Sequence, residues 1–227
     1  MNKWYLILGC VFLLPFSVLA QDNMDLYIAA DDGDLSKVRE LTQQGYDVNV
    51  ICPTICSGWT PVMIASANGH FEIVKFLLEH GANPNAQNRF GRTPIMFATR
   101  YHNKRIIEIL LQYGADPTIT SQDDETPNSA MADALIMSIQ DPDAYEILKM
   151  LVQKTGNVRF SFWDFTPLLL AVRNDDYDFA KYLLDHGADP DQVKTVQQNG
   201  KAVTYDLNSL AQSEKMGNLI RSYQTKD

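Results

Sequence analysis

Two cysteines lie close together in the chain, and their spacing is compatible with three kinds of chemistry. Cys52 and Cys56 enclose Pro53-Thr54-Ile55. Paired thiols can close a disulfide, exchange it in a redox reaction, or bind a metal as thiolates. No thioredoxin-like sequence surrounds the pair, and two thiolates alone make an incomplete metal site. We therefore predict a disulfide, which would contribute about 2 kcal/mol and hold the shape of one short loop.

Other residues that commonly perform catalysis form no recognisable pattern. The sequence has no Gly-x-Ser-x-Gly motif, no phosphate-binding glycine loop and no His-Glu-x-x-His motif. The acidic runs Asp31-Asp32 and Asp123-Asp124-Glu125 lack the spacing of an EF-hand and are read as solvated loops. We predict no enzymatic activity, no cofactor and no metal ion.

A short phrase returns along the chain at a fixed period. Gly58-Trp59-Thr60-Pro61 returns as Gly91-Arg92-Thr93-Pro94, and Gly81-Ala82-Asn83-Pro84 returns as Gly114-Ala115-Asp116-Pro117, both after 33 residues. Such a period is typical of one supersecondary unit stacked on copies of itself. Each unit then completes its hydrophobic core with its neighbours.

The residues within this period resemble ankyrin repeats. The stretch 58–83 matches almost throughout, and 93–114 and 166–187 match in the same register. The resemblance covers residues 24 to 222 approximately. It implies an all-α ankyrin-repeat solenoid of helix-turn-helix units with β-hairpin fingers, with about six repeats including capping repeats. The approximate repeat boundaries are 24–57, 58–90, 91–123, 124–163 and 164–199, followed by a C-terminal cap at 200–223.

Local signals give the expected helix boundaries. Each Thr-Pro opens an inner helix, and a glycine follows each outer helix. His102 stands where Gly69 closes the turn one repeat earlier, so we expect local backbone strain there. In the fourth repeat, Thr126-Pro127 lies about eight residues too early for the outer helix that follows it. Either the inner helix is long, at about 128–140, or the loop before it is long. After a hairpin turn at Asn199-Gly200, we expect two short capping helices at 202–210 and 215–223.

The histidines follow the same repeat register. His70 stands where ankyrin repeats commonly have a structural histidine, and His80 and His186 precede glycines at equivalent positions. Equivalent residues lie in a row along a stack and do not surround a point, so we predict no metal cluster.

The resemblance also implies where a partner would bind. Ankyrin repeats contact partners through the fingers and the adjoining inner-helix face, and aromatic and arginine side chains dominate binding hot spots. The predicted partner-binding residues are Trp59, Arg89, Phe90, Arg92, Arg100, Tyr101, Phe162, Trp163 and Arg173. We expect Trp59, Arg92 and Tyr101 to be exposed. Packing between neighbouring fingers is the alternative, and for Phe162 and Phe165 the two interpretations stay equally open.

The first 20 residues have the features of a secretory signal peptide. Lys3 precedes the apolar run 4–14, and Val18-Leu19-Ala20 fits a cleavage site. The run is too short to span a membrane, and Pro15 interrupts it. We predict a signal peptide at 1–20, one ankyrin-repeat domain at 21–227, and no membrane insertion of the mature chain. Export to an oxidising compartment supports the disulfide.

These observations favour a non-enzymatic protein–protein interaction module. The net charge of −9 argues against nucleic acid as a partner. We expect a monomer, periplasmic in a bacterium or else secreted, that binds one protein through its fingers and concave inner-helix face. It would act as an immunity protein against an exported toxin, as an accessory factor for a periplasmic enzyme, or on a host protein. A self-associating surface protein is one alternative. Another is a small-molecule binder or enzyme with a pocket between Met131, Asp133 and 160–165.

Overall fold

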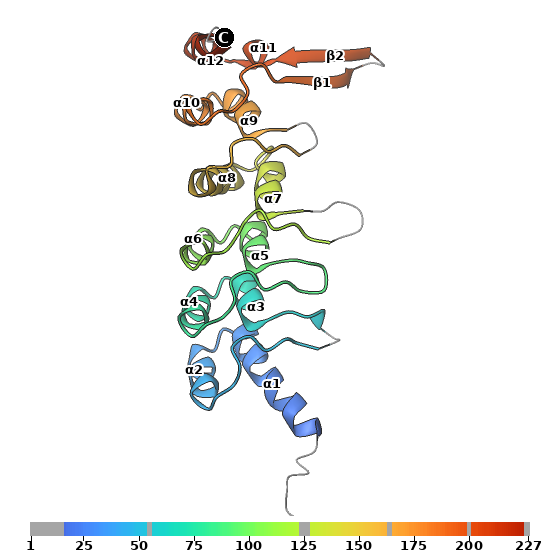
Figure 1. Ribbon diagram of the computed structural model, residues 1–227, viewed down its shortest axis with the longest axis vertical. Helices are drawn as coiled ribbons and strands as arrows, with labels where there is room; N and C mark the ends of the chain where they lie inside the picture. The colour runs from blue at the N-terminus through green and yellow to red at the C-terminus, as the bar shows by residue number, and fades with distance from the viewer. Residues whose placement is uncertain (1–15, 54–55, 123–127, 163–164, 199–200, 225–227) are drawn as a thin grey trace, which may run out of the picture.

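The computed structural model describes residues 16–53, 56–122, 128–162, 165–198 and 201–224. Within these residues, the helices follow one another in pairs along a single axis (Figure 1). The helices are α1 (Phe16–Asp31), α2 (Leu35–Gln43), α3 (Pro61–Asn68), α4 (Phe71–Glu79), α5 (Pro94–Arg100), α6 (Lys104–Gln112), α7 (Ala130–Met137), α8 (Pro142–Thr155), α9 (Pro167–Arg173), α10 (Tyr177–Asp185), α11 (Leu207–Leu210) and α12 (Glu214–Gln224).

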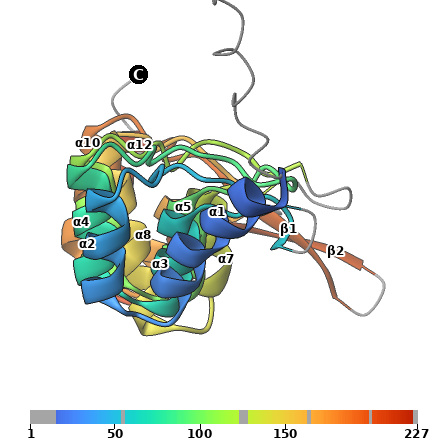
Figure 2. The same cartoon turned by 90° about the horizontal axis from the view of Figure 1, so that it is seen from below.

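Odd-numbered helices form an inner layer and even-numbered helices an outer layer. Seen along the axis, the two layers lie side by side, and the connecting fingers project to one side past the inner helices (Figure 2). Inner and outer helices of a repeat pack on each other, and equivalent helices pack on one another from α1 to α7 in the inner layer and from α2 to α6 in the outer layer. The expected all-α solenoid is confirmed.

The inner helices start where the Thr-Pro signals predict. Thr60, Thr93 and Thr166 are the N-cap residues of α3, α5 and α9, and each is followed by proline. The Thr166 hydroxyl accepts a hydrogen bond from the Leu169 N–H at 3.1 Å. At Thr93 the backbone N–H donates to the Met96 sulfur at 3.5 Å. The methionine therefore packs in the core and also satisfies one helix-terminal donor.

The turn between inner and outer helix has a left-handed residue in four repeats. Gly33 has φ 77°, Gly69 has φ 79°, His102 has φ 56° and Asp175 has φ 53°. A residue with a Cβ atom is strained in this region by about 1 kcal/mol or more. The strain predicted at His102 is confirmed, and Asp175 repeats it.

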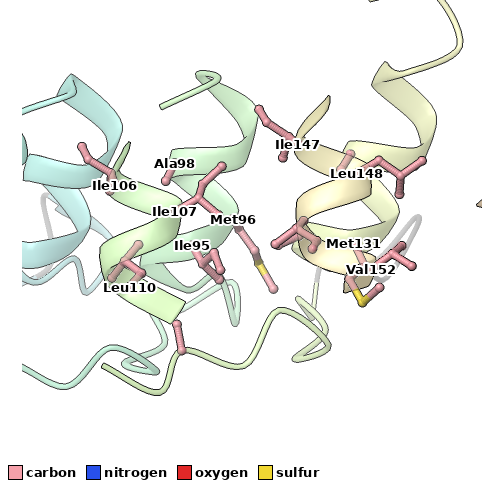
Figure 3. Packing of buried hydrophobic residues seen from close by; sticks show 14 of the residues in the cluster. Ile95, Met96, Ala98, Ile106, Ile107, Leu110, Met131, Ile147, Leu148 and Val152 are labelled. Atoms are coloured by element: carbon pink, nitrogen blue, oxygen red, sulfur yellow. The ribbon is translucent and has the colours of Figure 1, made fainter. Parts of the chain in front are cut away.

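The hydrophobic core runs the length of the stack between the two layers. Apolar side chains of α5 and α6 face those of α7 and α8 across the boundary between the third and fourth repeats (Figure 3). Ile107, Leu110 and Leu148 are fully buried there. Consecutive repeats thus share one core sideways, which leaves the fingers and the ends of the inner helices outside it.

The irregular fourth repeat has a short inner helix. Helix α7 begins after Ser129, whose hydroxyl accepts from the Ala132 N–H at 3.2 Å. A long inner helix at 128–140 is therefore wrong. The segment before α7 is longer than the one before α5, and outer helix α8 has 14 residues where α4 and α6 have nine. Thr126-Pro127 lies outside the described residues.

The C-terminal cap differs in part from the prediction. Strands β1 (Val193–Gln198) and β2 (Lys201–Asp206) pair in antiparallel orientation, and the turn residues predicted between them, Asn199-Gly200, lie outside the described residues. The predicted helix at 202–210 is wrong over 202–206, because that segment pairs with β1 and is extended. Asp206 caps the short helix α11 instead, through a hydrogen bond from the Ser209 N–H at 2.7 Å. Helix α12 confirms the second capping helix.

No helix among the described residues is long and apolar enough to cross a membrane.

Candidate protein-binding surface

Backbone hydrogen bonds connect the fingers of successive repeats. The Arg89 N–H in the second finger donates to the Ser57 carbonyl of the first at 2.9 Å. The Gln122 N–H of the third donates to the Phe90 carbonyl at 2.8 Å. Gly91 permits this approach, because a Cβ atom there would lie 2.9 Å from the Gln122 nitrogen. The first three fingers thus form one connected row.

The cysteine pair lies in the first finger, next to a predicted binding residue. Cys52 and Cys56 have their Cα atoms 5.5 Å apart, a separation typical of disulfides. The Cys52 N–H donates to the Trp59 carbonyl at 2.8 Å, and the Trp59 N–H donates to the Cys56 carbonyl at 3.1 Å. The backbone of Trp59 is therefore held from both sides by the cysteine loop.

Trp59 is less exposed than the sequence led us to expect. Its ring lies 4.1 Å from that of Phe97 in α5, measured between centroids and tilted by 37°. Phe97 is buried, and Trp59 is half-buried against it. The expected free exposure of Trp59 is wrong, because its ring packs on the inner helix of the next repeat. Arg92 is likewise only half-exposed.

Two arginine–aromatic pairs lie on the second and third repeats, one on a finger and one on an inner helix. Arg89 and Phe90 are at the tip of the finger, and Arg100 and Tyr101 are at the C-terminal end of α5. All four side chains are exposed, Phe90 to 48% and Tyr101 to 59%. The exposure expected for Tyr101 is confirmed.

A small polar groove lies beside Arg100, where the third and fourth repeats meet. Its volume is about 180 Å³, and its lining residues are Arg92, Met96, Phe97, Arg100, Ser121, Asn128 and Asp133. The Asn128 side-chain amide donates to an Asp133 carboxylate oxygen at 2.6 Å, and the Asn128 N–H donates to the Ser121 hydroxyl at 3.0 Å. Pockets for small organic ligands usually exceed about 300 Å³. This groove is large enough for a side chain of a partner.

The groove differs from the pocket that the sequence led us to consider. That pocket was expected between Met131, Asp133 and residues 160–165. Met131 is instead buried in the core, and Asp133 faces the third repeat. Sequence reasoning missed Asn128 because the inserted residues before it break the repeat register, and it missed Ser121 because a serine in register with Asn88 carries no binding signal of its own.

Some of the predicted binding residues in the later repeats make contacts within the fold. A guanidinium nitrogen of Arg173 donates to the Ile139 carbonyl. Phe162 and Phe165 bond to each other through both backbone groups at 3.0 Å and pack against the core, which favours the packing interpretation for both. Trp163 lies outside the described residues.

The described residues contain no group of three or more His, Cys, Asp or Glu side chains that could hold a metal. His80 and His186 contact backbone carbonyls of their own helices, at 2.8 Å and 2.7 Å. His70 contacts the Asp31 carbonyl at 3.0 Å. Each of these three histidine side chains therefore contacts a backbone carbonyl within the repeats.

The largest pKa change lies away from this surface. Burial, followed by the Asp176 carboxylate, raises the pKa of the Tyr145 hydroxyl, which donates to Asp176 at 3.2 Å. Tyr145 is in outer helix α8, and Asp176 precedes outer helix α10. This pair joins two outer helices and is not part of the finger surface.

Comparison with known proteins places this architecture in a family. A family model of ankyrin repeats in three copies matches residues 26–121 and 123–194. The chain is 27% identical over 201 residues to the ankyrin repeat and KH domain-containing protein mask-1 of Caenorhabditis elegans, covering 86% of this chain and 7% of that protein.

Two shorter matches point the same way. One is to the 2-5A-dependent ribonuclease of Mus musculus, at 36% identity over 73 residues, which is 32% of this chain and 10% of that protein. The other is to the human ankyrin repeat domain-containing protein 39, at 39% identity over 62 residues, which is 27% of this chain and 32% of that protein. The matches thus span a third or less of each relative's length. Because the repeat model matches well over half of the sequence, the chain belongs to the ankyrin-repeat family.

Proposed function

We propose that this protein is a non-enzymatic interaction module that binds one protein partner through the fingers and inner-helix face of its second and third repeats. The observation that carries the proposal is the pair of exposed arginine–aromatic dipeptides, Arg89-Phe90 and Arg100-Tyr101, on connected structural elements. Tyrosine and arginine are over-represented among residues that dominate binding energy.

The connected fingers support this function energetically. Association costs free energy when interface loops must be ordered. Here the finger backbones are already joined at Arg89–Ser57 and Gln122–Phe90. A partner therefore meets a surface whose main elements are in place, and more of the contact energy is retained as affinity.

We further propose that the chain acts outside the cytoplasm. The signal-peptide features of residues 1–20 and the close approach of Cys52 and Cys56 support export to an oxidising compartment, periplasmic or extracellular. The partner would then be an exported protein, such as a toxin or a periplasmic enzyme. Mass spectrometry of the exported chain tests this: cleavage after Ala20 and a disulfide are expected, and an uncleaved chain with free thiols contradicts it.

The chain offers a matched pair of tyrosines for testing the binding surface. Tyr101 is the C-cap of inner helix α5 and Tyr113 is the C-cap of outer helix α6, with exposures of 59% and 41%. After a partner has been isolated from an oxidised periplasmic extract, we expect Tyr101→Ala to weaken its binding by about 2 kcal/mol or more and Tyr113→Ala to change it little. Equal effects would refute the assignment of this face.

A further inference from the structure

The protein is acidic, but one part of its surface lacks carboxylates. Between Val48 and Ala115 the sequence contains only three acidic residues, Glu72, Glu79 and Glu108. All three lie on outer helices, the first two on α4 and the third on α6. The second finger and the inner helices α3 and α5 therefore carry no carboxylate. Arg89 lies on this finger, and Arg92 and Arg100 line the groove beside α5. In a chain of net charge −9, this surface is locally positive.

The arginines elsewhere in the fold contact other groups of the protein. Arg39 lies over the Phe76 ring at 4.7 Å and Arg105 over the Phe71 ring at 4.0 Å. Arg159 donates to the Gly187 carbonyl at 2.5 Å. Arg173 and Arg221 donate to Ile139 and Asn218.

Arg89 and Arg100 are different. Neither side chain makes an ion pair or hydrogen bond to any other residue that the structure describes, and both are exposed. Each is followed in sequence by an exposed aromatic ring. Among the described residues, nothing neutralises either guanidinium group, which leaves its charge for a ligand.

The positive surface ends at the fourth repeat. Asp133 forms the far wall of the groove beside Arg100, where its carboxylate accepts from Asn128. The acidic run 123–125 follows in the sequence and lies outside the described residues. An anionic ligand would therefore lie on the second and third repeats, on the Arg100 side of the groove.

We propose that the partner presents an acidic polypeptide segment to this surface, with carboxylates on Arg89 and Arg100 and an apolar or aromatic side chain against Phe90 or Tyr101. This inference rests on the proposed function and adds the chemistry of the partner. A guanidinium binds a carboxylate through two parallel hydrogen bonds, which gives direction as well as charge complementarity.

The spacing of the two arginines sets the length of the segment. Helix α5 has seven residues, so the two arginine–aromatic pairs are at least about 10 Å apart along it. An extended chain covers about 3.3 Å per residue. The two carboxylates that contact Arg89 and Arg100 therefore need to lie at least about three residues apart along the segment.

The test is selection of binders to the purified, oxidised chain from a displayed library of random short peptides. We expect the selected pool to be enriched in Asp and Glu together with aromatic residues. For one selected peptide, Arg89→Gln combined with Arg100→Gln should weaken binding about tenfold or more and make it less sensitive to salt. The matched control is Lys75→Gln with Lys154→Gln, which removes the same charge from outer helices α4 and α8 and should change binding less than about twofold.

The outcomes separate the two proposals. Selection of neutral or basic peptides whose binding is lost in Tyr101→Ala would overturn the acidic segment and leave the interaction surface standing. Failure to select any peptide dependent on Tyr101 would count against the proposed function itself. If the lysine control weakens peptide binding as much as the arginine variant does, the effect depends only on net charge and the inference is overturned. Binding of a single-stranded DNA oligonucleotide as tightly as the acidic peptide would also overturn it.

Discussion

Trp59 joins the candidate binding surface to the hydrophobic core. Its truncation should therefore reduce both the stability of the protein and the binding of a partner. A tryptophan buries about 150–250 Å² when fully enclosed. Trp59 is half-buried, so we take about 100 Å² of apolar area, which corresponds to about 2.5 kcal/mol. The contact between its ring and that of Phe97, with centroids 4.1 Å apart, adds about 1 kcal/mol. Because denatured chains already bury part of this area, we expect Trp59→Ala to lower the free energy of unfolding by about 3 kcal/mol.

The assay is thermal and urea unfolding of the oxidised chain, followed by far-ultraviolet circular dichroism. For a domain of this size a loss of about 3 kcal/mol lowers Tm by about 6–12 °C. Trp59→Phe keeps an aromatic ring on Phe97 and should cost about half as much. Tyr101→Ala is the exposed control and should stay within about 0.5 kcal/mol of the wild type. A Trp59→Ala variant as stable as Tyr101→Ala would refute the packing of the finger on α5.

Three further results are expected. Leu77→Ala, at a fully buried site in α4, should cost about 2–5 kcal/mol of stability without a specific effect on partner binding, as measured by urea unfolding and calorimetry. Thiol titration of the unfolded, unreduced full chain should detect only Cys10, whereas three thiols would exclude the Cys52–Cys56 disulfide, whose loss should cost about 2 kcal/mol. Burial and the Asp176 carboxylate raise the pKa of Tyr145. Above about pH 10 the unfolded state therefore loses the Tyr145 proton while the folded state keeps it. Stability should fall above that pH, and Tyr145→Phe should reduce the fall, which unfolding at several pH values can measure.

The repeat architecture could be read from the sequence because its signals are local. The Thr-Pro pair sets the start of α3, α5 and α9, and the residue types in the turn set its left-handed conformation. Both depend on neighbours within one helical turn. The same signals located the strain at His102, which takes the place of a glycine.

The errors arose where a distant partner decides the structure. Residues 202–206 are extended because they pair with 193–198, and a local helical pattern cannot reveal that pairing. Trp59 was expected to be exposed because its contact, Phe97, belongs to the next repeat. The groove formed with Ser121 and Asn128 could not be placed because the residues inserted before Asn128 have no equivalent in the other repeats.

The repeat register predicts where the candidate binding residues lie, but it does not predict their exposure or their contacts. Repeat alignment located Phe90, Arg100 and Tyr101 on the exposed face. It also selected Arg173, whose guanidinium donates to Ile139 within the fold. Exposure and hydrogen bonding separate these cases, and neither is visible in a single sequence.

The most direct measurement of the central claim is calorimetric titration of an isolated partner into the wild-type chain, Tyr101→Ala and Tyr113→Ala. If the stacked repeats leave the inner-helix ends and fingers to hold the partner, Tyr101→Ala should raise Kd about 30-fold, which corresponds to about 2 kcal/mol. Tyr113→Ala should leave Kd unchanged. A larger loss with Tyr113→Ala, or none with Tyr101→Ala, would show that the partner binds elsewhere.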